Sequence, residues 1–99
     1  MAGPKQGDYV VVRGENSGAF VGVLAAMDGR TIVLDHSIRL WFWSGAASLS
    51  QLAVEGVSRP DQCKFPPPVD GHAILDVIEV MPATAKAKAS IAEVKPWRS

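Results

Sequence analysis

The chain has 99 residues, which is the length of one domain with a thin hydrophobic core. Basic and acidic residues number ten each, so the formal net charge is zero and broad, charge-driven binding to nucleic acid or to an anionic membrane is not expected. The single cysteine, Cys63, cannot form an internal disulfide, and the sequence has no signal peptide and no run of about 20 apolar residues, so we expect a cytoplasmic protein without a membrane partner.

The first half of the chain predicts an antiparallel meander. Apolar runs rich in β-branched residues are separated by turn residues, and the Asp28-Gly29 pair is typical of a hairpin. A tail is expected at residues 1–7 and a single β-rich domain at residues 8–99. The expected strands are Tyr9–Arg13, Ala19–Ala26, Thr31–Leu34 and, after an interruption at Asp35-His36-Ser37, Ile38–Trp43.

Two short helices and one more strand are predicted in the second half. Ser48 and Gln51 have the spacing of a capping box, and Gly56 is placed to end that helix in the left-handed conformation. Three prolines at 66–68 force an extended connector. The remaining elements are a strand at Ala73–Met81 and a second helix, capped by Thr84, over about residues 85–94. The fold class is therefore mainly β (α+β), with an antiparallel twisted sheet or small barrel of about five strands and two short helices.

Residue patterns for catalysis are missing from the sequence. There is no phosphate-binding P-loop and no dinucleotide fingerprint, and neither histidine has a second histidine or a cysteine at metal-ligand spacing. Cys63 and a histidine could in principle act as nucleophile and base, but a small, half-buried cysteine is the simpler interpretation. We therefore expect a protein that is not an enzyme and uses no cofactor and no metal.

The most unusual segment runs from Arg39 to Trp43. In a strand, alternation would place Arg39, Trp41 and Trp43 on one side and leave the other side for the core. Two indoles and a guanidinium on one face suit a ligand with a base and a phosphate. Alternatively, both tryptophans pack under a helix or against another subunit, with Arg39 stacked on them. The expected core side of this strand carries Ile38, Leu40 and Phe42.

A second candidate contact lies at the end of the first strand. Arg13 precedes a loop, residues 14–18, that is rich in residues tolerating positive φ. A guanidinium beside such a loop is well placed to meet an anion, and a solvated strand-end charge is the alternative. Ser17-Gly18 is too short to count as a phosphate-binding loop on its own.

The stretch from Arg39 to Ala53 (RLWFWSGAASLSQLA) resembles a family of small proteins from bacteriophages and prophages. The similarity extends from Asp8 to about Val94 and includes the segments Val54-Glu55-Gly56, Cys63-Lys64-Phe65, Val69-Asp70 and Ile74–Pro82. More loosely, the chain is similar to the phage sponge proteins that counter the Thoeris defence. Those proteins bind a cyclic ADP-ribose-type signal without degrading it, and they assemble as oligomers with ligand pockets at subunit junctions.

This resemblance implies a phage-encoded immune-evasion protein in the cytoplasm of the infected bacterial host. Its partner would be a small nucleotide second messenger, of cyclic ADP-ribose or cyclic oligonucleotide type, and it would be a homo-oligomer. Asn16 stands where the family usually carries an aromatic residue, which leaves the ligand's identity open. The expected ligand-binding residues are Arg13, Ser17, Gly18, Arg39, Trp41 and Trp43.

Other functions are compatible with the same residues. The tryptophans would form a subunit interface in a structural or protein-interaction accessory protein of a phage. They would form a stacking platform in a small nucleic-acid-binding barrel, although the neutral net charge counts against that function. An enzyme acting on a nucleotide is the weakest alternative, because no catalytic constellation is present.

Overall fold

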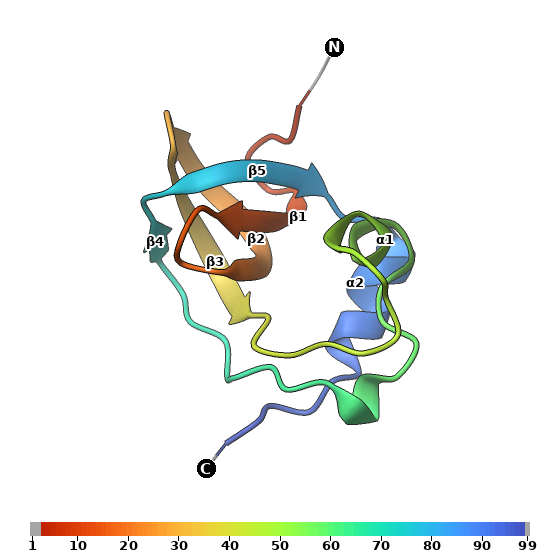
Figure 1. The fold of residues 1–99 in the computed structure, drawn as a ribbon. Coiled ribbons are helices and arrows are strands. Elements are labelled where there is room, and N and C mark those ends of the chain that lie inside the picture. The colour runs from red at the N-terminus through yellow and green to blue at the C-terminus, as the bar shows by residue number, and fades with distance from the viewer. Residues whose placement is uncertain (1–2, 99) are drawn as a thin grey trace.

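One five-stranded antiparallel sheet carries two helices on one of its faces (Figure 1). A computed structural model describes residues 3–98. The strands follow the order β4-β3-β2-β1-β5 across the sheet, which is open and twisted, so the predicted fold class is confirmed. The elements are β1 (Tyr9–Gly14), β2 (Ala19–Asp28), β3 (Thr31–Arg39), α1 (Leu49–Glu55), a 3₁₀ turn (Pro60–Gln62), β4 (His72–Ile74), β5 (Val77–Pro82) and α2 (Ala85–Ala92).

The two edge strands are joined by a corner of only two residues. Leu75 and Asp76 connect β4, which pairs with β3, to β5, which pairs with β1 at the opposite edge. A connection this short requires the sheet to curl until its edges approach each other. The single strand expected over Ala73–Met81 is therefore wrong, because alternation of apolar residues does not distinguish a straight strand from two strands that meet at a corner.

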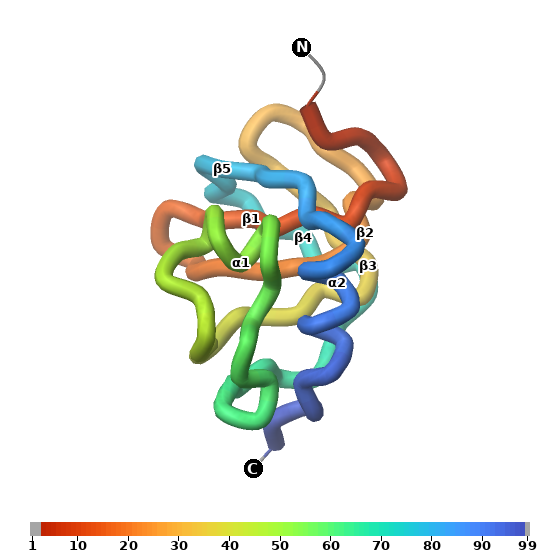
Figure 2. The backbone as a smooth tube through the Cα atoms, turned by 90° about the vertical axis from the view of Figure 1, so that its right-hand side faces the viewer, coloured from red at the N-terminus to blue at the C-terminus, as the bar shows by residue number. Residues whose placement is uncertain are grey.

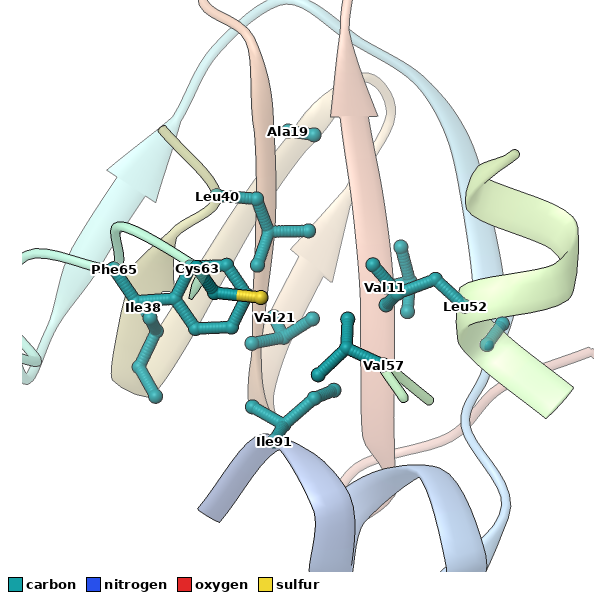
Figure 3. Packing of buried hydrophobic residues seen from close by; sticks show 11 residues of the cluster. Val11, Ala19, Val21, Ile38, Leu40, Leu52, Val57, Cys63, Phe65 and Ile91 are labelled. Carbon is teal, nitrogen blue, oxygen red and sulfur yellow. The ribbon is translucent and has the colours of Figure 1, made fainter. Parts of the chain in front are cut away.

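The first core cluster lies between the sheet and the two helices. Leu52 on α1 and Ile91 on α2 point toward Val11 and Val21 on the central strands (Figure 3). Figures 1 and 2 place the two helices side by side on this face of the sheet. The cluster consists of Val11, Ala19, Val21, Ile38, Leu40, Leu52, Ala53, Val57, Cys63, Phe65 and Ile91.

A second core cluster fills the concave side of the curled sheet. Successive strand residues point to opposite faces, so the valines of β1 contribute alternately to the two clusters. This explains why Val10, Val11 and Val12 are all buried in a chain of this size. The members of the second cluster are Val10, Val12, Phe20, Leu24, Ile32, Leu34, Ile74 and Val77.

Strand β3 passes through the expected interruption but ends earlier than expected. A register shift lies where Asp35-His36-Ser37 passes Gly22, and His36 adopts a positive φ of 51°. An added Cβ at Gly22 would lie 3.0 Å from the Asp35 carbonyl oxygen, so a larger residue there would push the β3 backbone back by a few tenths of an ångström. The strand then ends at Arg39, since its partner β2 begins at Ala19 and offers no further ladder.

The segment after Arg39 is therefore not the predicted strand. Phe42 forms one isolated bridge with Lys64, and the residues on either side of it have irregular backbone. Of the three expected core residues, Ile38 and Leu40 are buried as predicted, whereas Phe42 is 51% exposed. The expected common face of Arg39, Trp41 and Trp43 is thus wrong, because strand alternation does not continue past Arg39.

The helix ends follow the predicted chemistry. The Ser48 hydroxyl accepts a hydrogen bond from the Gln51 amide at 3.1 Å, and Gly56 ends α1 with φ 78°. The Gln51 side chain completes the cap by accepting from the Ala47 amide rather than from Ser48. Thr84 caps α2, which ends at Ala92, two residues before its expected end. Neither helix is long or apolar enough to span a membrane.

Candidate functional site

A pocket of about 340 Å³ lies between the loop of residues 14–18 and the segment that leads into α1. Arg13, Gly18 and Trp43, which the sequence predicted as ligand contacts, all line it. They come from β1, from the loop and from the irregular segment after β3, so the fold brings together residues 30 positions apart. The other lining residues are Gly14, Glu15, Asn16, Ala19, Leu40 and Leu49.

Arg13 supplies a positive charge at the rim of the pocket. Its Nε lies 3.3 Å from Glu79 Oε1, and the two side chains are 52% and 40% exposed. Ion pairs this exposed contribute about 0–1 kcal/mol to stability, so little free energy is lost when the guanidinium exchanges Glu79 for another anion. Arg13 can therefore bind a phosphate at this rim.

Trp43 and two leucines form the apolar wall. The Trp43 indole is partly buried against the first core cluster, which limits its rotation and leaves part of it facing the pocket. The Leu40 amide donates to the Ala19 carbonyl at 2.9 Å and fixes this wall next to the start of β2. A planar ring can stack on an indole held in this way. Leu49, the first residue of α1, was not among the expected ligand contacts, because its position in this wall depends on how the helix packs.

Ser17, an expected ligand contact, does not line the pocket, and its hydroxyl and amide are bonded to Asp76. The Ser17 hydroxyl donates to Asp76 Oδ1 at 2.5 Å, and the Asn16 and Ser17 amides donate to Asp76 Oδ2 at 2.8 and 3.0 Å. These bonds, with that of the Ser17 hydroxyl the largest cause, hold the pKa of the Asp76 carboxyl below its ordinary value. Sequence reasoning missed the role of Asp76, and the signal was a carboxylate within the apolar run of Ile74–Val80.

Arg39 supports the other side of the same loop. Its Nη1 donates to the Ser17 carbonyl at 2.9 Å, and its guanidinium carbon lies 4.6 Å from the centroid of the Phe20 ring. Arg39 is not among the residues that line the pocket. The predicted cation–π contact of Arg39 with the tryptophans is therefore wrong, and Arg39 makes such a contact with Phe20 instead.

Trp41 belongs to a separate surface. It stacks on Trp97 with ring centroids 6.3 Å apart and an interplanar angle of 14°, and Lys64 Nζ lies 5.6 Å from the Trp97 ring. Trp41, Phe42 and Trp97 are 63%, 51% and 43% exposed, and we call these three residues the aromatic patch. The backbone beneath it is held, because Lys64 bonds with Phe42 and the Trp97 amide donates to the Phe65 carbonyl at 2.8 Å.

A serine–histidine pair lies between β3 and β4, which the sequence analysis did not anticipate. Ser37 Oγ is 2.9 Å from His72 Nδ1, and the His72 ring packs edge-on against Phe20. Burial, and then the charge of Arg39, lower the pKa of His72. Ser37 is buried in the interior, so its hydroxyl is not presented to a substrate in this conformation. Among residues 3–98, no group of three or more histidine, cysteine or carboxylate side chains could hold a metal ion.

Residues 7–91 match the family described as Domain of unknown function (DUF6948), and the chain therefore belongs to that family. No curated protein and no solved structure matches the chain.

Proposed function

We propose that the chain is a phage-encoded immune-evasion protein that binds a nucleotide second messenger and holds it without degrading it. Its site is the pocket of Arg13, Gly18 and Trp43, and its place of action is the cytoplasm of the infected host. The observation that carries the proposal is the convergence of a guanidinium, a glycine and an indole from three separate segments around one pocket. The viral origin and the immune signal rest on the sequence resemblance to phage proteins.

The size of the pocket fits one mononucleotide unit. Its volume of about 340 Å³ lies near the lower end of the roughly 300–1,000 Å³ that is typical of small-molecule sites. A base stacked on Trp43 contributes about 1–3 kcal/mol, and a charge-assisted hydrogen bond from Arg13 to phosphate contributes about 1.5–3 kcal/mol. One stacking contact and one phosphate contact together give only modest affinity, because the free-energy cost of ordering the ligand is subtracted from their sum. Tight sequestration of a cyclic dinucleotide or cyclic ADP-ribose would therefore use two pockets, one from each of two copies.

The experiment is a thermal-shift screen against cyclic ADP-ribose isomers and cyclic di- and trinucleotides. We expect one of these ligands to raise the melting temperature, and denaturation should return it with unchanged mass. Trp43→Leu, which keeps an apolar side chain but removes the indole, and Arg13→Ala should each reduce the shift. The matched control for Arg13→Ala is Arg59→Ala, which removes an exposed guanidinium that lies outside both the pocket and the aromatic patch.

Two results would contradict this proposal. If none of these nucleotides shifts the melting temperature, the pocket does not bind this class of ligand. If a nucleotide binds but is returned with a changed mass, the protein is an enzyme and not a sponge.

A second candidate function, that of a protein-interaction module, is favoured by the aromatic patch. Three large aromatic side chains are exposed on a bonded backbone, and two of them, Trp41 and Trp97, stack on each other. Exposed apolar surfaces of this kind mark interaction sites. Aromatic residues are also enriched at protein–protein interfaces. The patch and the pocket are lined by different residues, so both functions are compatible with one chain.

A further inference from the structure

Asp76 lies at the corner between β4 and β5, next to the C-terminal end of β1, because Gly14 pairs with Val77. Its hydrogen bonds connect this corner to the loop of residues 14–18. Its carboxylate accepts from the Asn16 amide, the Ser17 amide and the Ser17 hydroxyl. Its backbone carbonyl accepts from the Glu15 amide at 2.8 Å. A single residue about 60 positions away thus bonds three consecutive residues of the loop.

The loop also packs closely against this carboxylate at Gly14, where a side chain would clash with its neighbours. A Cβ added at Gly14 would lie 2.0 Å from Ser17 Oγ and 2.6 Å from Asp76 Oδ1. Contacts shorter than 3.0 Å force a shift, so a larger residue at position 14 would displace the Ser17 hydroxyl and the Asp76 carboxylate from their present positions. Gly14 and Asp76 therefore act together to fix the loop conformation.

The same loop forms one wall of the pocket. Gly14, Glu15, Asn16 and Gly18 line it, whereas Asp76 and Ser17 do not. The Asn16 and Ser17 amides are occupied by Asp76, so the loop cannot offer them to an anionic ligand without losing those bonds. The contribution of Asp76 to ligand binding is thus indirect and acts through the shape of the wall.

We propose that Asp76 is a positioning residue that holds the loop of residues 14–18 in its binding conformation before a ligand arrives. This inference rests on the proposed nucleotide pocket. A loop that is ordered in advance does not have to be ordered by the ligand, and ordering a loop weakens binding. Loss of the carboxylate should therefore weaken nucleotide binding by about tenfold, mainly through faster dissociation.

The test compares Asp76→Asn and Gly14→Ala with the wild-type protein and with Asp28→Asn. Asp28 is exposed at the end of β2 and its side chain has no hydrogen-bond partner among residues 3–98, so this control removes the same charge without touching the loop. The first measurement is amide hydrogen exchange without ligand. We expect faster exchange at Glu15, Asn16 and Ser17 in both loop variants, protection of β1 and β2 as in wild type, and no change in the control.

The second measurement is the dissociation constant of the same variants for the nucleotide identified by the thermal-shift screen. Unchanged exchange at these three amides would overturn the inference whether or not any nucleotide binds. Faster exchange with wild-type affinity would also overturn it, because Asp76 would then serve the stability of the loop alone. If the wild-type protein binds no nucleotide while amide exchange is faster in the two loop variants, the proposed function fails, and the positioning role for a nucleotide fails with it. That result would still show that Asp76 orders the loop.

Discussion

At the scale of single residues, Tyr9 is a direct probe of burial. Packing against the first core cluster raises the pKa of its phenol to about 12, and it is the only tyrosine in the chain. The unfolded chain titrates near pH 10. Because the folded protein favours the neutral phenol, this stabilisation is complete below about pH 10 and is lost as the pH rises toward about 12.

Phenolate absorbance of the native protein, recorded against pH, measures this directly. We expect the transition near pH 12, and a denatured sample should titrate near pH 10. Chemical-denaturation midpoints should fall between these two pH values. A native transition near pH 10 would mean that Tyr9 is solvated and that its packing at the start of β1 is wrong.

At the scale of secondary-structure elements, α1 should contribute to stability through one face only. Leu52 is fully buried and faces the sheet, whereas Val54, two residues away, is 57% exposed. Leu52→Ala should lower the free energy of unfolding by about 2–5 kcal/mol, because it leaves a cavity between α1 and the sheet. Val54→Ala should change it by less than about 0.5 kcal/mol. Urea denaturation of both variants measures the contrast, and equal effects would contradict this packing of the helix.

Elements whose ends depend on local chemistry were predictable from the sequence, and those whose ends depend on distant partners were not. Ser48 and Thr84 cap the helices through their side chains, and these predicted roles are confirmed. Gly56 ends α1 with a positive φ of 78°, as predicted, but its ψ of −154° differs from that of the left-handed helical conformation. The end of β3 at Arg39 depends instead on where β2 begins. The corner at Asp76 likewise depends on a loop 60 residues earlier in the chain. No periodicity within a window of the sequence contains such information.

At the scale of the whole molecule, only some of the predicted ligand contacts meet at the pocket, because their grouping depends on distant parts of the chain. Arg13, Gly18 and Trp43 meet at the pocket because β1, the loop and the irregular segment after β3 converge there. Arg39 and Trp41 were grouped with Trp43 on the assumption of a continuous strand. Because that strand ends at Arg39, Arg39 packs on Phe20 and Trp41 stacks on Trp97 instead. The residue types were therefore informative about chemistry, whereas their grouping required the tertiary fold.

The aromatic patch predicts that a second copy of the chain docks on it. Charged residues make up only 20% of the chain against a typical share of about 25%. The surface therefore carries fewer charges than usual to oppose association between copies of the chain. With about 150–250 Å² per aromatic side chain, the patch exposes roughly 300 Å². An interface needs about 800 Å² per partner, so the patch would form its centre. Sedimentation velocity over a range of concentrations should detect an oligomer.

The double variant Trp41→Ser, Phe42→Ser should weaken this association by at least about tenfold, because central aromatic residues carry most of the binding energy of an interface. The matched control is Met27→Ser, since Met27 is an exposed apolar residue at the end of β2, outside the patch. A wild-type protein that stays monomeric at every concentration would contradict the prediction. So would equal weakening by the control, because association would then reflect general stickiness of the surface and not a defined interface.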